Sequence, residues 1–107
     1  MNNKKAIEKA LQSIDSDFIK ALTEPARIEI LKWLILNGSS DVKTLAESMP
    51  QDRSVISRHL VLMEKAGLVR ASKQGRHVIY SLDGKSALQK SERLFESIRQ
   101  CFKSNCC

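Results

Sequence analysis

The residues best suited to chemistry are three cysteines, which lie within the last seven positions of the 107-residue chain and are its only cysteines. Cys101, Cys106 and Cys107 could supply thiolates, which are soft ligands that suit soft, thiophilic ions. A continuous helix would place Cys101 and Cys106 about 140° apart around its axis. Convergence of the three sulfurs therefore requires Ser104 and Asn105 to break the helix.

These cysteines also permit other interpretations. Cys101 could form a reversible disulfide with Cys106 or Cys107, which would make the tail sensitive to redox state. Cysteines of a second subunit could complete the site, whereas zinc fits less well because a fourth ligand is not evident. The tail could also carry its cysteines without function, or Cys101 could simply be packed.

The segment after Asp52 has two contrasting helical faces. At 100° per residue, one face carries Ile56, Leu60 and Met63 flanked by Val55 and Leu62, and the other carries Ser54, Ser57, Arg58 and Val61. The small residues allow close approach to base edges, and an arginine can contact guanine through two hydrogen bonds. We therefore expect a DNA-reading helix that Asp52 caps and Gly67 ends.

Two short β-rich runs, 68–72 and 77–82, follow this helix and are joined by a glycine-containing hairpin at 73–76. Val78, Tyr80 and Leu82 alternate onto one face, which can pack against the helices. Lys73 and Arg76 at the tip suit phosphates or the minor groove. Helix, glycine and basic hairpin together predict a winged helix-turn-helix. An α/β unit with a solvated basic loop is the alternative.

The rest of the chain shows the spacing of helices. Apolar residues predict a first helix over 7–22, a second that starts at Pro25 and stops at 37–38, a short third within 39–49, and a last helix after Asp83. Pro50 and Gln51 form the turn before the reading helix. The expected fold is therefore mainly α with a small β-hairpin, in the order α-α-α-α-β-β-α. We expect residues 1–107 to form a single domain whose cysteine-containing tail spans 101–107.

Charge is concentrated on the expected reading element. The chain has 18 Lys and Arg against 12 Asp and Glu, a net charge of +6. Six basic and two acidic residues lie between positions 51 and 77, so this segment alone contributes +4. Such a distribution is typical of a nucleic-acid binder, with another acidic partner as the alternative.

Several classes of protein are not expected from the sequence. No apolar run reaches membrane-spanning length and no signal-type stretch follows the N-terminus, which predicts a cytoplasmic protein with reduced cysteines and no membrane partner. No Ser/His/Asp set, paired carboxylate site or phosphate-binding glycine loop stands out, so an enzyme is not expected.

Four segments of the chain resemble the arsenical-repressor (ArsR/SmtB) family: ALTEPARIEIL at 21–31, LAE at 45–47, SVISRHL at 54–60 and AGLV at 66–69. The resemblance extends over about residues 18–82. It implies a homodimeric winged-helix repressor whose first and last helices form the dimer interface. Such a dimer places two reading helices roughly one DNA turn apart on a palindromic operator, and an inducer releases it.

The resemblance also indicates where an inducer could bind. Family members with a Cys-x-Cys pair in the third helix would carry it at Asp41 and Lys43, so that site is absent. A zinc site of Asp and His residues along the last helix is absent too, because 83–107 contains no histidine. The C-terminal thiols remain, and the implied inducers are As(III) or Sb(III), without an organic cofactor. A three-sulfur ring at the end of a dimer-interface helix would then alter the spacing of the reading helices.

The expected site residues fall into three sets. The DNA-binding set is Arg53, Ser54, Ser57, Arg58, His59, Lys73 and Arg76; the dimer-interface set is Phe18, Leu94, Phe95, Ile98 and Phe102; the metal set is Cys101, Cys106 and Cys107. The expected partners are double-stranded operator DNA and a second copy of the chain. Alternatives are a redox-responsive repressor, a metalloid carrier that binds no DNA, and a module whose basic winged helix binds protein.

Overall fold

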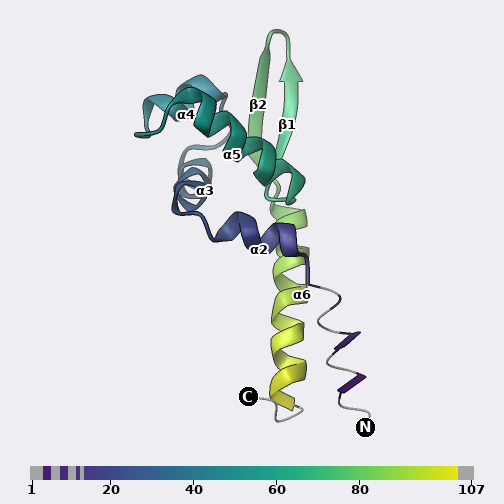
Figure 1. The fold of residues 1–107 in the computed structure, drawn as a ribbon. Coiled ribbons are helices and arrows are strands. Elements are labelled where there is room, and N and C mark those ends of the chain that lie inside the picture. The colour runs from purple at the N-terminus through teal and green to yellow at the C-terminus, as the bar shows by residue number, and fades with distance from the viewer. Residues whose placement is uncertain (1–3, 6–7, 10–11, 13, 104–107) are drawn as a thin grey trace.

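The computed structural model describes residues 4–5, 8–9, 12 and 14–103 (Figure 1). In chain order its elements are α2 (Ser16–Leu22), α3 (Pro25–Asn37), α4 (Val42–Glu47), α5 (Arg53–Lys65), β1 (Val69–Gln74), β2 (His77–Leu82) and α6 (Gly84–Lys103). The predicted mainly helical fold with a two-stranded antiparallel hairpin is confirmed. None of the helices among these residues is long and apolar enough to cross a membrane.

Helix boundaries follow local capping chemistry. The expectation of one helix over 7–22 was wrong, because Ile14 and Asp15 are not helical. The Asp15 carboxylate accepts a hydrogen bond from the Phe18 N–H at 3.1 Å and so starts α2 afresh. Asp41 caps α4 in the same way, through the Thr44 N–H at 2.8 Å. That helix is therefore shorter than the interval 39–49 allowed.

The core forms where α5 packs against the helices that precede it. Ile56, Leu60 and Met63 are completely buried, as the sequence predicted, and they meet Ile30 of α3 and Leu45 of α4. Burial of side chains of this size contributes about 1.5–3 kcal/mol each. The inner face of α5 is therefore held firmly, and this fixes the direction of its outer face.

The hairpin is attached to the body at its base. β1 and β2 pair from Val69 opposite Leu82 to Gln74 opposite His77, and the two-residue turn uses Gly75 at φ 63°. Ser40 exchanges two backbone hydrogen bonds with Tyr80, at 2.9 and 2.7 Å.

The strand face predicted to pack does so only near this base. Tyr80 is buried and Leu82 half-buried, whereas Val78 is exposed because the hairpin projects beyond the helices (Figure 1).

α6 runs from the base of the hairpin away from the other helices (Figure 1). Its 20 residues correspond to a rod of about 30 Å. Only Ser97 of this helix is classed as buried. Figure 1 shows the half of α6 nearest the C-terminus extending beyond α2 to α5, although Ser97 in that half is buried.

Candidate nucleic-acid interface

The outer face of α5 is open to solvent as the sequence predicted. Ser54 and Arg58 are exposed, Ser57 is half-buried, and Arg53 is the exposed first residue of the helix. Asp52 stands at the N-cap position but makes no side-chain capping hydrogen bond among the described residues. The face therefore combines the short side chains of Ser54 and Ser57 and the exposed Val61 with two arginines, which leaves room for a close approach to base edges.

A tight corner joins α5 to the wing. Gly67 has a φ of 80°, and the Leu68 N–H donates to the Met63 carbonyl at 2.9 Å, which closes the helix in the manner of a Schellman motif. The Glu64 carboxylate accepts from the Ala71 N–H of β1 at 3.0 Å. These two hydrogen bonds therefore fix the direction in which the hairpin leaves the helix.

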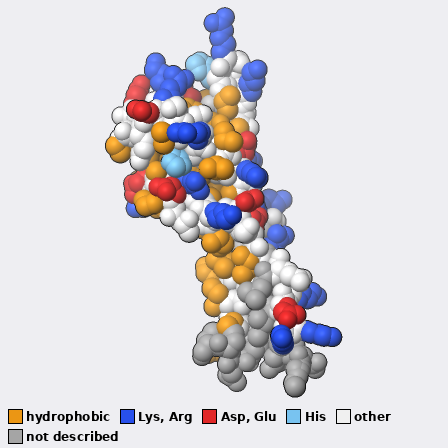
Figure 2. Space-filling model, in the orientation of Figure 1, with side chains coloured by type: hydrophobic (Ala, Val, Ile, Leu, Met, Phe, Trp, Pro, Cys, Tyr) orange, Lys and Arg blue, Asp and Glu red, His pale blue; other side chains and the backbone are white. Residues whose placement is uncertain are grey.

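A cleft of about 230 Å³ brings wing and reading helix together. It is lined by Arg53 of α5, Arg76 and His77 of the wing, and Lys43 of α4, together with Asp41, Val42 and Val78. We call it the basic cleft. Two predicted DNA-binding residues, Arg53 and Arg76, thus meet there, and Lys43 of α4 and His77 of β2, which were not predicted to bind DNA, line the same cleft. Figure 2 shows Lys and Arg side chains gathered over this upper part of the molecule and along the hairpin.

One carboxylate lies within the basic cleft. Asp41 Oδ2 is 3.9 Å from His77 Nδ1. The hydrogen bonds from Thr44 hold the pKa of Asp41 below its usual value, with smaller help from the charges of His77 and Arg53. Asp41 is thus ionised at neutral pH and occupied with capping α4. Lys73, predicted at the hairpin tip, is instead an exposed residue of β1 opposite Val78.

A pair that the sequence did not reveal joins α3 to α5. Arg27 Nε donates to His59 Nδ1 at 3.1 Å, and Arg27 Nη1 donates to the Lys20 carbonyl of α2 at 3.2 Å. His59 is half-buried. Burial lowers the pKa of His59, and the positive charge of Arg27 lowers it further. His59 is therefore a neutral side chain fixed to α3, rather than a free cation of the reading face.

A lysine of α6 joins three elements. Lys90 Nζ lies 2.7 Å from Asp15 Oδ2 at the start of α2, and it donates to the carbonyl of Ala66 at the end of α5 at 2.8 Å. The hydrogen bond from Lys90 is the main reason why the pKa of Asp15 lies below its usual value. The upper part of α6 is thus tied directly to the end of the reading helix.

The predicted dimer residues divide into two groups. Phe95 and Ile98 are each 54% exposed, Phe102 is 75% exposed, and Leu94 is half-buried. Leu88, also exposed, extends this stripe toward the N-terminus of α6. Phe18 was placed wrongly, because it is buried in the core of its own subunit. Its ring fills the space between helices and is not available on the surface.

Of the three predicted metal ligands, Cys101 alone lies among the residues that the structure describes. Cys101 is half-buried in the last turn of α6 and is disulfide-bonded. Cys106 and Cys107 lie outside the described residues. Within the ranges that the structure describes, no cluster of three or more His, Cys, Asp or Glu side chains could hold a metal ion.

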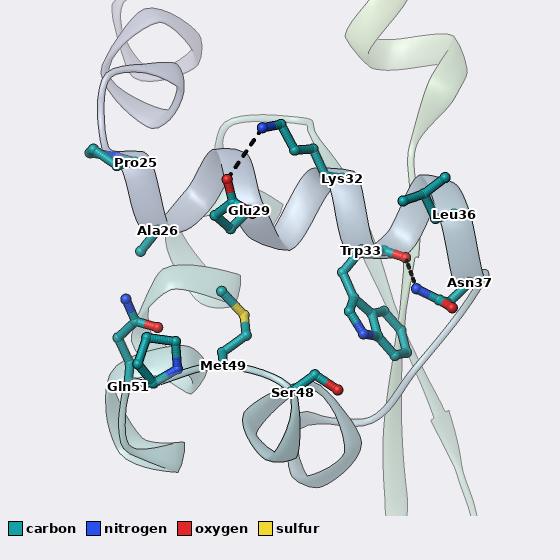
Figure 3. A pocket seen from close by; sticks show the side chains of 11 residues that line it. Pro25, Ala26, Glu29, Lys32, Trp33, Leu36, Asn37, Ser48, Met49 and Gln51 are labelled. Carbon is teal, nitrogen blue, oxygen red and sulfur yellow. Dashed lines mark hydrogen bonds and ion pairs between the residues drawn. The ribbon is translucent and has the colours of Figure 1, made fainter.

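A second cleft, of about 390 Å³, lies between α3 and the turn that precedes α5. Trp33 points from α3 toward Ser48, and Met49 reaches up toward α3 (Figure 3). The charges at its rim neutralise each other, because Lys32 pairs with Glu29 at 3.3 Å. This mainly apolar cleft is therefore separate from the basic cleft and offers nothing to a phosphate.

Comparison with known proteins places this geometry in a family. Residues 24–71 match the family described as "Bacterial regulatory protein, arsR family". An uncharacterized HTH-type transcriptional regulator of Methanocaldococcus jannaschii is 37% identical over 65 residues, which cover 61% of this chain and 73% of that protein. A cadmium resistance transcriptional regulatory protein CadC homolog of Staphylococcus aureus is 33% identical over 76 residues, or 71% of this chain and 63% of the relative.

Solved structures agree with the sequence matches. The crystal structure of a possible transcriptional regulator for arsenical resistance is 36% identical and superposes with a TM-score of 0.68, covering 78% of this chain and 85% of that one. An ArsR-like transcriptional regulator from Rhodococcus is 30% identical with a TM-score of 0.70, covering 92% and 84%. The chain therefore belongs to the ArsR family of winged-helix transcriptional regulators.

Proposed function

We propose that the protein is a repressor that binds operator DNA as a homodimer and releases it when As(III) or Sb(III) binds the thiolates of Cys101, Cys106 and Cys107. The observation that carries the DNA-binding part is the basic cleft. There Arg53, at the start of the exposed α5 face, and Arg76 of the wing line one depression. Phosphate contacts on both sides of a reading helix fix its register in the groove.

The exposed stripe on α6 supports the homodimer. Leu88, Phe95, Ile98 and Phe102 recur at intervals of three, four and seven residues, so they lie on one side of the helix. An aromatic and aliphatic surface of this kind is costly to leave in water. Pairing with the same stripe of a second copy covers it and places two α5 helices on one side of the dimer. We propose that residues 1–107 act as one such domain per subunit.

The donor chemistry supports a thiophilic inducer. Cys101 stands in the last described turn of α6, and two further cysteines follow within six residues. Three thiolates suit a soft ion that accepts three ligands, as As(III) and Sb(III) do. Relatives of the chain include a possible regulator for arsenical resistance and a cadmium resistance regulator. The present chain offers thiol ligands only at its C-terminal end.

The position of the thiols supports a mechanism of release. Ion binding draws the chain after α6 back onto Cys101 and so changes the end of the dimer-forming helix. Lys90 connects the same helix to the last carbonyl of α5. A tenfold loss of operator affinity requires only about 1.4 kcal/mol of coupling, which lies within the usual range.

A mobility-shift titration tests the proposal. The full-length reduced protein should retard DNA from upstream of its own gene, and arsenite or antimonite should release it. Single Cys→Ser variants at 101, 106 and 107 should bind this DNA as the wild type does, because none of these positions belongs to α5 or the wing, yet resist release. X-ray absorption of the arsenite complex should show three sulfur neighbours. Normal release of all three variants would contradict the thiol site.

A second candidate, a redox-responsive repressor, is favoured by one observation. Cys101 is disulfide-bonded in the structure. Two thiols would lose two protons and two electrons to a peroxide, which is reduced to water or an alcohol, as the sulfur–sulfur bond forms. Under this alternative peroxide alone releases the operator, Cys101→Ser abolishes that response, and a thiol reductant restores binding. Release by arsenite under fully reducing conditions, with no response to peroxide, would exclude it.

A further inference from the structure

The hydrogen bond between Arg27 and His59 fixes the chemical form of the imidazole. A guanidinium nitrogen can only donate, so His59 Nδ1 must hold a free electron pair to accept from Arg27 Nε at 3.1 Å. The ring is then neutral, and its single proton is on Nε2. Imidazolium cannot form this bond, because both of its nitrogens carry protons.

The geometry leaves one donor of His59 unused. Among the described residues, no partner is found for its Nε2. The side chain is half-buried, so part of the ring reaches solvent. It follows directly after the exposed Arg58 on α5. A half-buried ring whose Nε2–H has no partner among the described residues is suited to an oxygen acceptor from outside the protein.

We propose that Arg27 is a positioning residue for DNA binding, which holds His59 in the Nε2–H tautomer so that the ring presents a neutral N–H donor to a phosphate oxygen of the operator. The inference rests on the proposed DNA-binding function and adds to it. Arg27 acts from α3, two elements before the reading helix. Its second bond, to the Lys20 carbonyl, anchors the guanidinium to α2.

The charges around His59 agree with this assignment. Burial is the main cause that lowers its pKa; Arg27 and Arg58 act in the same direction, and Glu24 opposes them. At neutral pH the imidazole therefore stays neutral. A neutral donor displaces no counterion, so this contact should contribute to affinity without contributing to its salt dependence.

Nitrogen NMR tests the tautomer in the wild-type protein itself. The chain has only two histidines, His59 and His77, so His77→Gln assigns both rings. We expect His59 to show a protonated Nε2 and an unprotonated Nδ1 at pH 7.5. In Arg27→Gln the ring should approach the mixture of tautomers seen for solvated histidine. A His59 with its proton on Nδ1, or an unchanged ring in Arg27→Gln, would overturn the inference.

Operator binding tests the consequence. Arg27→Gln and His59→Ala should each weaken binding roughly 3- to 10-fold, the usual worth of one hydrogen bond, and the double variant should be no weaker than His59→Ala alone. Neither should change the slope of affinity against salt, whereas Arg53→Gln should lower that slope by about 1. Arg99→Gln is the matched control, since it removes one charge from the polar face of α6.

The outcomes separate this inference from the proposed function. If the wild type binds no operator, the DNA-binding proposal fails and with it the phosphate contact of His59. If the wild type binds and Arg27→Gln binds equally well, only the positioning inference fails. Additive losses in the double variant would also contradict it, because they would show that Arg27 acts independently of His59. Arg27→Lys, which keeps the charge but not the fixed Nε–H, should lose affinity as Arg27→Gln does.

Discussion

Two helices of this protein carry similar apolar side chains, which are buried on one helix and exposed on the other. On α5, Ile56, Leu60 and Met63 are completely buried, whereas on α6 Phe95, Ile98 and Phe102 are all more than half exposed. The first set is covered by the helices that precede it in the same chain. The second lies on a projecting rod (Figure 1). The difference indicates that the winged-helix body buries its apolar side chains within one chain, while the exposed stripe on α6 is left for the second copy proposed above.

The largest expected effect comes from placing charge on the exposed stripe. Ile98→Asp should convert the dimer to monomer and abolish operator binding, because burial of such a side chain contributes about 1.5–3 kcal/mol and each dimer contains two copies. Analytical ultracentrifugation at micromolar concentration measures the result. Gln89→Asp, which adds the same charge to the polar face of α6, should remain dimeric. A dimeric Ile98→Asp would show that the stripe is not the interface.

Truncation of a buried side chain in the core should reduce stability more than truncation of an exposed side chain on α6. Leu60→Ala should lower the free energy of unfolding by about 2–5 kcal/mol, because Leu60 is completely buried and leaves a cavity. Phe102→Ala, which removes a larger but exposed side chain, should lower the unfolding free energy of the monomeric Ile98→Asp background by far less. Urea denaturation of both variants in that background gives the values. Equal losses would mean that α6 packs within its own subunit.

The reading face should respond to loss of its arginine. Arg58→Ala should cost about 1–3 kcal/mol of operator affinity and reduce discrimination between operator and unrelated DNA, if it contacts a guanine. Arg76→Ala in the wing should weaken both kinds of DNA alike and flatten the salt dependence. Competition titrations at several salt concentrations distinguish the two patterns. Unchanged operator affinity in Arg58→Ala would remove it from the interface.

The link between the two regions can be cut at Lys90. Lys90→Met should lower the unfolding free energy by at least about 0.5–1.5 kcal/mol, because the Ala66 carbonyl loses its hydrogen bond and Asp15 loses its ion pair. It should also reduce the inducer-dependent loss of operator affinity. Lys85→Met, an exposed lysine one turn earlier on α6, controls for the charge. Full inducer response in Lys90→Met would show that the signal reaches α5 by another route.

A smaller effect is expected on the pH dependence of stability. The pKa of His59 is lowered from 6.5 in the folded protein by burial and by Arg27. As the pH falls below 6.5, the unfolded chain takes up a proton that the folded chain refuses, so stability decreases. Above 6.5 both states are neutral and the contribution is complete. Urea denaturation between pH 5 and 8 should show a shallower decrease for His59→Gln than for the wild type.

The sequence predicted what depends on periodicity and local turns. The buried face of α5, the glycine that ends it and the two-stranded hairpin all follow from patterns within a few residues of each other. The failures lie where distant segments meet. Phe18 has the spacing of an interface residue, yet the helices that reach it from later in the chain enclose it. Arg27 and His59 stand 32 positions apart, so nothing in either local pattern reveals their bond.

Helix capping and the length of the hairpin explain the remaining differences between the sequence-based predictions and the structure. Asp15 looked like one polar position in a continuous helix, but its carboxylate competes for the Phe18 N–H and breaks that helix. Val78 alternates correctly with Tyr80, yet strand alternation gives only the face and not the distance that the hairpin extends beyond the helices. The presence of Lys43 and His77 in the basic cleft was also not predictable from local patterns. The pairing of Ser40 with Tyr80 of β2 brings these two residues, which are far apart in the sequence, close together.

The corner at Gly67 has a consequence for how this sequence can vary. A β-carbon built there would lie 2.5 Å from Ser86 Oγ and 2.8 Å from Lys90 Nζ, and the φ of +80° is unfavourable for any other residue. A saturation library should therefore find position 67 almost empty of functional substitutes, alanine included.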